Sequence, residues 1–560
     1  MTNATHYRIS KNMQIRLTLV LIFVGIVANQ IIGQTPDSSK VIAAADKVIA
    51  TVAAKASAAP GCAIGVSLDG KSVYERAFGM ADLEYSIPNT AQTIFESGSV
   101  AKQFTAASIV LLSLEGKLKL DDPVNKYITE LPDYGAPLTI RHLMNHTGGV
   151  RDWGTVLSLT GFGRGDRVVS QDLAMDVIVH QRGLDFTPGA EYSYSNSGYT
   201  LLSTIVERVS KQTLPVFTAE RFFKPIGMTN TTWRDDYQRI VPGRAQAYAQ
   251  QGTGPWRLEM PFMNVYGNGG MLTTVGDWLK WNAMFESRSM GAKLVDEMET
   301  TGVLNDGRKI AYALGISVNT YNGQRQVAHS GSTAGYTTYL ARYPNLKMSV
   351  AVLCNAASAN PTALAHSVVD GVIGPPPAPV QPEAVEMSAA DLQKHVALWR
   401  HEKTHLPIRT VVENNAIRVV GGPLLRPTRD GLFASSLTRA KFEPAENGKP
   451  ATVVITAAES KDLYIAEAAW TPTTGELKAF AGDWYSDEAG ATFTFAVDGD
   501  NAFFVQRPST REPLRPQFKD HFTLGNGTSQ VIWFTRSGNS MTLHIGTSRM
   551  RDMPFTRVSR

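Results

Sequence analysis

A proline-rich segment divides this chain into two parts of different character and limits the folds that each part can adopt. Residues 372–379 read Val-Ile-Gly-Pro-Pro-Pro-Ala-Pro, a composition typical of a linker. Beyond it, two similar units alternate apolar and polar residues, and Leu392 with Trp399 repeats the spacing of Leu477 with Trp484. We therefore expect a linker at 375–384 and two small antiparallel, barrel-like β domains at 385–475 and 476–560.

The first residues have the layout of a secretory signal peptide. Arg8, Lys11 and Arg16 precede an apolar run over 17–28. The run is short for a membrane-spanning helix, and Asn29-Gln30 ends it. We expect residues 1–33 to be a signal peptide and the mature protein to be secreted or periplasmic, with an N-terminal membrane anchor as the alternative.

Composition places the rest of the chain among ordinary globular proteins. The 560 residues are 43% hydrophobic and 19% charged, with a net charge of +4. This length predicts roughly two to four domains. Basic residues are scattered and form no run suited to nucleic acid. The chain has two cysteines, Cys62 and Cys354, and two small core residues are the preferred interpretation.

The part before the linker mixes helices and strands, and we assign residues 34–374 to one domain. Alanine-rich residues 34–58 predict a helix. Residues 61–68 predict a buried strand that turns back at Asp69-Gly70. Two late strands are predicted at 337–343 and 348–353, the second buried on both faces.

The stretch from Phe95 to Phe104 carries the main chemical signal. Gly98 permits a turn, and a 3-4-3 spacing of apolar residues predicts an amphipathic helix after it: Phe104, Ala107, Leu111 and Leu114. Ser99 then lies at the helix N-terminus, where free N–H groups favour negative charge. Lys102 projects from the same face. A buried lysine is costly unless it is paired or neutral, and a neutral amine beside a hydroxyl is a base beside a nucleophile.

Two further motifs could supply partners for Ser99. Tyr194-Ser195-Asn196 lies where a turn enters a helix predicted at 199–209, which Asn196 or Ser197 can cap. His329-Ser330-Gly331 opens a strand just before the last strands of the domain. Both patterns recur elsewhere in the chain, so that neither identifies a site by itself.

Together and in this order, the motifs resemble the serine β-lactamase and penicillin-binding-protein superfamily, in its class C branch. Other landmarks of this resemblance, which covers about 40–370, are Leu120-Asp121-Asp122-Pro123, His146-Thr147-Gly148-Gly149 and Gly269-Gly270-Met271. It implies an α/β (α+β) fold, a β-lactamase/transpeptidase-like antiparallel sheet packed by helices beside a helical lobe. It also implies an acyl-enzyme on Ser99, a general-base role shared by Lys102 and Tyr194, and Asn196 as the group that orients Lys102 and holds the substrate amide. Backbone N–H groups of Ser99 and Ser332 would form the oxyanion hole.

The third motif departs from the β-lactamase pattern. His329 and Gly331 stand where β-lactamases carry Lys-Thr-Gly. Histidine is mostly neutral at pH 7, whereas lysine is a permanent cation suited to a substrate carboxylate. The His-x-Gly form is similar to that of D-aminopeptidases and many esterases of the superfamily, and D-aminopeptidases carry two small barrels after the catalytic domain. In that family a loop from the last domain reaches the active site; the sequence does not show whether this occurs here.

The resemblance thus predicts an exported serine hydrolase that acts through an acyl-enzyme on an amide or ester, as a D-aminopeptidase-like peptidase or amidase. The alternatives are a carboxylesterase, a weak β-lactamase or DD-carboxypeptidase, and a non-catalytic penicillin-binding or peptidoglycan sensor protein. We expect a small-molecule or short-peptide substrate, with no cofactor, metal or nucleic acid. The oligomeric state stays open.

Several residues also have purely structural explanations. His146 and Thr147 are expected to hold a helix–loop junction rather than to touch substrate, and Trp278 and Trp281 are expected in the core. Tyr266 and Asn268 are secondary candidates for lining the pocket. The family's sheet order makes the first and last strands antiparallel neighbours, which would bring Cys62 near Cys354. A disulfide there is the alternative to two core thiols.

Overall fold

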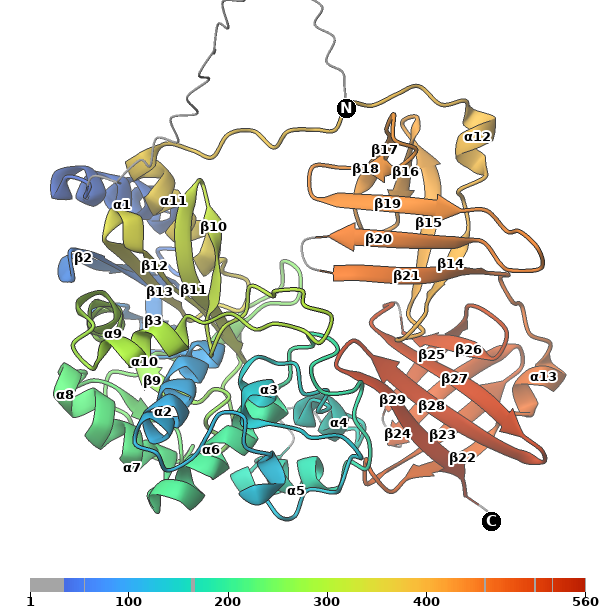
Figure 1. Ribbon diagram of the computed structural model, residues 1–560, viewed down its shortest axis with the longest axis horizontal. Helices are drawn as coiled ribbons and strands as arrows, with labels where there is room; N and C mark the ends of the chain where they lie inside the picture. Colours follow the sequence, from blue (N-terminus) through green and yellow to red (C-terminus); the bar gives the residue numbers. More distant parts are fainter. Residues whose placement is uncertain are drawn as a thin grey trace, which may run out of the picture.

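The computed structural model describes residues 35–54, 56–162, 167–457, 460–507, 510–525 and 527–558. The predicted signal peptide at 1–33 lies outside the described residues. Three bodies follow one another along the chain: a domain of helices and sheet, then two β barrels, one above the other at its side (Figure 1). Residues 375–383, between the first domain and the barrels, form neither helix nor strand. In the described part of the chain, no helix is long and apolar enough to cross a membrane.

The first domain is built around an antiparallel sheet with the strand order β10-β11-β12-β13-β1-β2. As predicted, β1 (Cys62–Leu68) and β13 (Met348–Cys354) are buried along their whole length. The turn from β1 to β2 (Lys71–Phe78) uses Asp69 and Gly70 with positive φ, which confirms the predicted hairpin. The remaining strands are β10 (Ser317–Tyr321), β11 (Gln324–Thr333) and β12 (Tyr336–Tyr343).

Helices cover both faces of this sheet. On one face, α1 (Ser38–Ala53) and α11 (Pro361–Ile373) share an apolar core with β1 and β13. On the other face, α9 (Val275–Ser287) lies so close that a methyl group on Gly65 would be 3.0 Å from the Val275 side chain. Trp278 and Trp281 of α9 are fully buried, as predicted.

A helical lobe packs beside the sheet, around α2 (Lys102–Leu114). A short 3₁₀ turn, η1 (Gly98–Ala101), precedes α2 and contains Ser99. The prediction of a single apolar face was wrong, because α2 is enclosed on nearly all sides and even its polar residues Gln103 and Thr105 are buried. At its far end, Leu114 is 47% exposed. A helix at the centre of a domain has no solvent face to define a stripe.

Further helices and several short strands complete the first domain. Its other helices are α3 (Ile140–Met144), α4 (Trp153–Ser158), α5 (Gln171–Val179), α6 (Asn196–Ser210), α7 (Leu214–Thr218), the π-helix η3 (Ala219–Phe223), α8 (Lys224–Ile226) and α10 (Ala292–Met298), with 3₁₀ turns η2 (Val124–Lys126) and η4 (Pro344–Leu346). Its short strands are β3 (Met80–Asp82), β4 (Ile87–Pro88), β5 (Phe95–Glu96), β6 (Thr232–Trp233), β7 (Tyr248–Ala249), β8 (Arg257–Leu258) and β9 (Met271–Thr273). β5 pairs with β9 immediately before η1, which fixes the start of the Ser99 turn.

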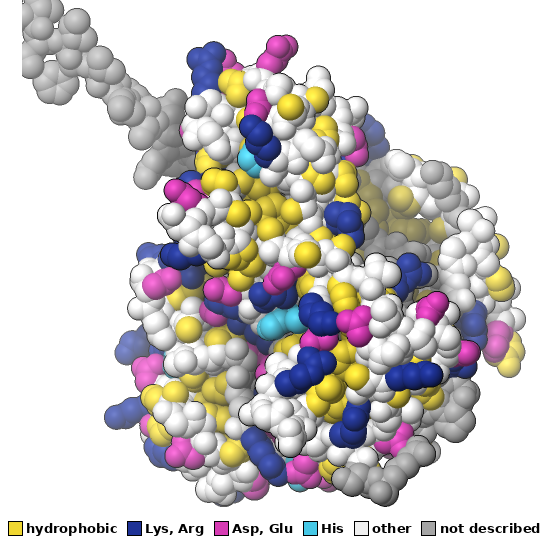
Figure 2. Space-filling model, turned by 90° about the vertical axis from the view of Figure 1, so that its right-hand side faces the viewer, with side chains coloured by type: hydrophobic (Ala, Val, Ile, Leu, Met, Phe, Trp, Pro, Cys, Tyr) yellow, Lys and Arg dark blue, Asp and Glu magenta, His cyan; other side chains and the backbone are white. Residues whose placement is uncertain are grey.

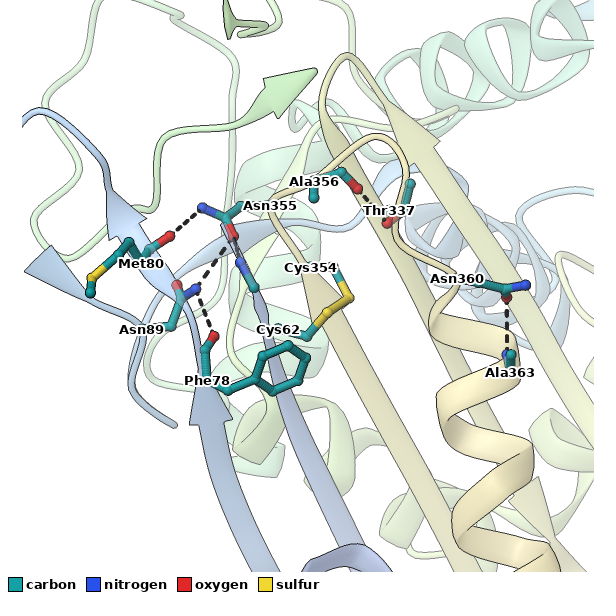
Figure 3. The surroundings of a disulfide bond; sticks show 11 residues. Cys62, Phe78, Met80, Asn89, Thr337, Cys354, Asn355, Ala356, Asn360 and Ala363 are labelled. Carbon is teal, nitrogen blue, oxygen red and sulfur yellow. Dashed lines mark hydrogen bonds between the residues drawn. A yellow bond between two sulfur atoms is a disulfide. The ribbon is translucent and has the colours of Figure 1, made fainter. Parts of the chain in front are cut away.

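A disulfide joins Cys62 and Cys354 at the shared end of β1 and β13 (Figure 3). The preferred prediction of two core thiols was therefore wrong, and the alternative taken from the family's sheet order is correct. The physical reason is strand register, which sets the two residues opposite each other and leaves no trace in the local sequence. Beside the disulfide, Asn355 accepts the Gly61 N–H at 2.8 Å and donates to the Met80 carbonyl at 2.9 Å.

The two C-terminal units are closed eight-stranded antiparallel barrels, which confirms the predicted pair of small β domains. The repeated Leu–Trp spacing has a structural cause, because Trp399 and Trp484 are each buried in the core of their own barrel. The first barrel follows α12 (Ala389–Gln393) and contains β14 (Leu398–His401), β15 (Pro407–Glu413), β16 (Ala416–Val419), β17 (Leu424–Pro427), β18 (Phe433–Ala434), β19 (Thr438–Glu443), β20 (Thr452–Ala457) and β21 (Ser460–Glu467). The second follows α13 (Thr474–Lys478) and contains β22 (Gly482–Ser486), β23 (Ala491–Asp498), β24 (Asn501–Arg507), β25 (Thr510–Pro516), β26 (His521–Leu524), β27 (Gln530–Ser537), β28 (Ser540–Thr547) and β29 (Met550–Arg557).

The second barrel docks on the helical lobe at α4. Val156 and Leu159 of the lobe are buried in contact with the apolar cluster of that barrel. Beside them, Arg151 forms a mostly buried ion pair with Glu488 at 2.7 Å. Figure 2 views the molecule from the barrel side and shows basic, acidic and histidine side chains gathered near the middle of this face. The contacts seat the barrel next to the loops that follow α3.

Candidate active site

Ser99 lies in a tight turn pressed against β11. Gly98 has a φ of 52°, and a methyl group there would be 2.5 Å from the backbone nitrogen of Ser332. A methyl group on Gly331 would meet the Ser97 carbonyl oxygen at 2.1 Å. Both glycines are therefore required for the close approach of the turn to the strand. This approach brings the Ser332 backbone nitrogen to the turn of Ser99.

Lys102 points its amine at Ser99 from inside the domain. Its Nζ lies 3.2 Å from the Ser99 Oγ, 2.9 Å from the Asn196 Oδ1 and 2.6 Å from the Asn268 carbonyl oxygen. The side chain has no exposed surface. Once it is neutral, this amine can reverse its contact with Ser99 and accept the hydroxyl proton.

Burial lowers the pKa of Lys102 to about 7. Two charged groups act on this pKa in opposite directions: the Asp152 carboxylate raises it, and the Arg549 guanidinium lowers it. A pKa near 7 leaves much of the amine neutral at neutral pH, which is the form that a general base requires.

Tyr194 packs against the same amine. The centroid of its ring is 4.9 Å from the Lys102 Nζ. Burial raises the pKa of the phenol, and the nearby Ser99 hydroxyl offsets only part of this rise. Within the described residues the phenol oxygen completes no hydrogen bond of ordinary geometry. The site therefore keeps Tyr194 as a neutral phenol and favours Lys102 as the proton acceptor.

Asp152, which the sequence did not single out, holds Asn196 in place. The helix α6 begins at Asn196, and neither Asn196 nor Ser197 caps it, contrary to the prediction. Instead the Asp152 carboxylate accepts hydrogen bonds from the backbone N–H and from the Nδ2 of Asn196, both at 2.8 Å. This leaves the Asn196 Oδ1 facing Lys102. No spacing or periodicity links Asp152 to Asn196, because the two lie in different segments.

His329 stands on β11 beside Tyr194, with ring centroids 6.3 Å apart. Its Nε2 lies 2.9 Å from the hydroxyl of Tyr312, another contact that the sequence did not suggest. Burial, together with the Lys102 cation, lowers the pKa of His329 to about 4. The imidazole is therefore neutral at pH 7, as expected from a histidine in place of a lysine.

The structure distinguishes among the residues that the sequence offered as secondary candidates for the site. The centroid of the His146 ring lies 4.2 Å from that of the Tyr194 ring, and its Nδ1 accepts the Ser195 N–H at 3.2 Å, so that His146 supports the Tyr194 loop. Asn268 lines the cleft, whereas Tyr266 is not part of the lining. Among the described residues, no group of three or more histidine, cysteine or carboxylate side chains could hold a metal ion.

The site opens into a cleft of about 890 Å³, a size suited to a small ligand. Ser99, Tyr194, Asn196 and His329 line it. The second barrel contributes Arg549, whose guanidinium carbon lies 5.1 Å from the centroid of the Tyr194 ring. A turn of the last domain therefore reaches the cleft, which answers the question that the sequence left open.

Comparison with known proteins agrees with this architecture. A family model described as Beta-lactamase matches residues 45–371, more than half of the chain. This chain belongs to the Beta-lactamase family. Penicillin-binding protein 4* of Bacillus subtilis is 30% identical over 304 residues, which are 51% of this chain and 66% of that protein. The D-aminopeptidase of Gluconobacter oxydans is 25% identical over 532 residues, which are 89% of this chain and 96% of that protein.

Solved structures extend the likeness of this Beta-lactamase family member beyond its first domain. The octameric penicillin-binding protein homologue from Pyrococcus abyssi has a TM-score of 0.53 and 22% identity, and the match covers 84% of this chain and 99% of that chain. SurE has a TM-score of 0.51 and 18% identity, with 93% and 99% covered. These similarities concern the fold. The structure confirms the predicted fold class, and the family model matches the first domain. Together they identify the chain as a serine hydrolase of the Beta-lactamase family.

Proposed function

We propose that this protein is a D-aminopeptidase-like amidase that transfers an acyl group from an amide to water through Ser99. One observation carries the proposal: a fully buried amine with a pKa of about 7 lies 3.2 Å from the Ser99 hydroxyl. The oxygens that surround this amine are neutral. A lysine that served only to stabilise the fold would be held by a carboxylate or would reach solvent.

In acylation, the Ser99 Oγ attacks the carbonyl carbon of the substrate while the Lys102 Nζ takes the hydroxyl proton. The carbonyl oxygen becomes negative, and the backbone N–H groups of Ser99 and Ser332 are the proposed donors to it. A single donor of this kind is worth about 3–4 kcal/mol in other hydrolases. The C–N bond then breaks as the proton passes from Lys102, by way of the Tyr194 phenol, to the leaving nitrogen. The products are a free amine and an ester on Ser99.

In deacylation, water takes the place of the departed amine. Lys102 accepts a proton from the water, whose oxygen attacks the ester carbonyl, and the Ser99 oxygen leaves and recovers that proton. Asn196 keeps the amine aligned throughout, and Asp152 keeps Asn196 aligned. Such alignment matters because a displacement of about 1 Å can cost roughly 10²-fold in rate.

The choice of D-amino-acid amides and short peptides rests on two supports. The Gluconobacter oxydans D-aminopeptidase matches 89% of this chain, which is more than the first domain alone could supply. In addition, β-lactamases carry the lysine of a Lys-Thr-Gly motif at the position of His329, and that lysine is a cation for their substrates. The imidazole of His329 is neutral at pH 7 and offers no such charge.

We also propose that the protein is exported. The pattern of residues 1–33 supports export. The Cys62–Cys354 disulfide supports it independently, because disulfides persist in oxidising compartments and are rare in the reducing cytosol.

Covalent labelling with a fluorophosphonate and peptide mass mapping test the proposed function, with assays on D-alanine p-nitroanilide, p-nitrophenyl esters and nitrocefin. We expect the adduct on Ser99 and the highest kcat/KM on the anilide. Ser99→Ala should lose the adduct and lower turnover roughly 10⁴-fold or more. Ser113→Ala, further along α2, is the matched control and should keep both. An adduct on another residue would overturn the assignment, and labelling without turnover of any substrate would indicate the sensor alternative.

A further inference from the structure

Arg549 presents an unpaired guanidinium to the cleft. The residue is exposed, and within the described part of the chain its side chain forms no ion pair. Two other arginines line the cleft. Arg234 is buried and pairs with Glu96 at 2.8 Å, and the guanidinium carbon of Arg167 lies 4.8 Å from the centroid of the Phe162 ring. A guanidinium that rests on an aromatic ring still offers the N–H groups at its edge to a ligand.

The turn that carries Arg549 is fastened to the first domain. The Arg549 carbonyl oxygen accepts the Asp152 N–H at 3.1 Å. Two residues later, Arg551 donates its backbone N–H to the Asp185 carboxylate at 2.9 Å and pairs with Glu191 at 2.8 Å. A cation on a fixed turn loses little freedom when it binds a ligand, which favours affinity.

The charges around the cleft favour an anion. Among the described residues that line it, Asp152 is the one carboxylate. One of its oxygens accepts two hydrogen bonds from Asn196, and the other accepts the Thr155 N–H. His329 is neutral at pH 7 because its pKa is about 4. Among the described residues, the cleft therefore presents two guanidinium groups without an ion pair, Arg549 and Arg167, and no free carboxylate. Of these two, Arg549 is the one that contacts Tyr194.

We infer that Arg549 binds a carboxylate on the leaving-group side of the substrate, and that the preferred substrates are short D-configured peptides with a free carboxyl terminus rather than simple amides. The inference rests on the proposed function and names its substrate class. Arg549 lies on the leaving-group side because it stacks on Tyr194, the phenol that passes a proton to the leaving nitrogen.

The chemistry of the pair fits this assignment. A guanidinium matches a carboxylate in a planar contact of two hydrogen bonds. In a dipeptide the carboxylate follows the scissile carbonyl by one residue, a span of roughly 3.3–3.6 Å, so that both groups fit within one cleft. The second barrel would thus provide the cation that the third motif lacks.

The experiment compares two substrates that differ in one charge, D-alanyl-D-alanine and D-alanyl-D-alaninamide, by the rate of cleavage of the bond between the two alanines. We expect a higher kcat/KM for the carboxylate. Arg549→Gln should lower the ratio of the two kcat/KM values about tenfold or more. The ratio is the right readout because Arg549 also lowers the pKa of Lys102, an effect that acts on both substrates alike.

Two variants serve as comparisons. Arg549→Lys keeps a cation and should retain most of the preference for the carboxylate. Arg511→Gln removes an exposed arginine of the same barrel, one that pairs with Asp498 outside the cleft, and should leave the ratio unchanged. A ratio in Arg549→Gln within twofold of the unmodified protein would overturn the inference.

A second measurement separates this inference from the proposed function. D-Alanyl-D-alanine and its amide are used to slow the labelling of Ser99 by a fluorophosphonate, which reports binding without turnover. We expect protection by the dipeptide at concentrations about tenfold lower than by the amide, and loss of this difference in Arg549→Gln. If neither peptide is cleaved but the difference in protection holds, the proposed amidase fails and the carboxylate site stands. Cleavage of both at equal rates, with equal protection, would leave the amidase and refute the carboxylate site.

Discussion

The backbone N–H of Asp152 donates a 3.1 Å hydrogen bond to the carbonyl oxygen of Arg549, which joins the helical lobe to the second barrel. The carboxylate of the same Asp152 holds Asn196, whose side chain accepts a hydrogen bond from Lys102. The barrel turn is thus linked to the candidate general base through two residues of the lobe. The charges of Asp152 and Arg549 also act on Lys102, in opposite directions.

The pH profile should report the protonation of Lys102. Because its pKa is about 7 and the neutral amine is the active form, kcat/KM should fall as the pH drops below about 7 and should level off above it. Asp152→Asn removes the carboxylate that raises this pKa, so that the acid limb should move to lower pH. In the unmodified protein one Asp152 oxygen accepts both hydrogen bonds from Asn196, and the other accepts the Thr155 N–H at 3.1 Å. Asparagine has one acceptor oxygen and cannot keep both arrangements, so we expect kcat to fall roughly 10–100-fold. An acid limb that stays in place in Asp152→Asn would show that Lys102 is not the titrating group.

Replacement of His329 tests why the third motif lacks a cation. His329→Lys should raise kcat/KM for carboxylated substrates relative to neutral ones, because it adds a charge where the imidazole is neutral at pH 7. His329→Gln, which stays neutral, is the control and should leave this ratio where it is. Paired kinetics on a peptide acid and its amide measure the effect, and an equal ratio in all three proteins would count against it.

The disulfide should contribute to the stability of the first domain. Reduction, or Cys62→Ser, frees strand ends that are 292 residues apart in sequence, and we expect a loss of about 2–5 kcal/mol and a fall of several degrees in Tm. Calorimetry with and without reductant measures the change. The double variant Cys62→Ser with Cys354→Ser should match the single one. Rapid alkylation of both thiols in the unreduced protein would show that the bond is absent.

Mild acid should loosen the contact between the two barrels. His405 of the first barrel stacks on Trp533 of the second at 4.3 Å, and its Nδ1 lies 3.1 Å from the Nε2 of His521. Burial, then the neighbouring His521 and Arg400, lower the pKa of His405 to about 4, an effect that Asp552 partly opposes. A folded pKa below the ordinary value of about 6.5 means that stability is present above that value and is lost as the pH falls from about 6.5 to 4.

His405→Phe keeps the stacked ring but cannot be protonated, and it is the matched control for this contact. Tryptophan fluorescence and small-angle scattering between pH 7 and 4 should show less change in His405→Phe than in the unmodified protein. Identical acid transitions in the two proteins would assign the change to other groups.

Local pattern and motif order were enough to predict much of this molecule. The hairpin at Asp69-Gly70, the buried β13 and the two C-terminal barrels follow from turn residues, apolar runs and a repeated Leu–Trp spacing. The prediction that α2 has a single apolar face was wrong, because other chain segments enclose the helix and its own sequence does not reveal them. The predicted cap of α6 was wrong for a similar reason, because Asp152, from another segment, accepts the Asn196 N–H at the start of the helix.

The sequence by itself determined the candidate nucleophile and its lysine, because their contact spans a single helical turn, and determined the order of motifs that points to the family. Only the tertiary structure decided the disulfide partner, the support of Asn196 by Asp152, the contact of His329 with Tyr312 and the presence of Arg549 in the cleft. Each of these depends on distance and burial between segments far apart in the chain, and such quantities exist only after the chain has folded.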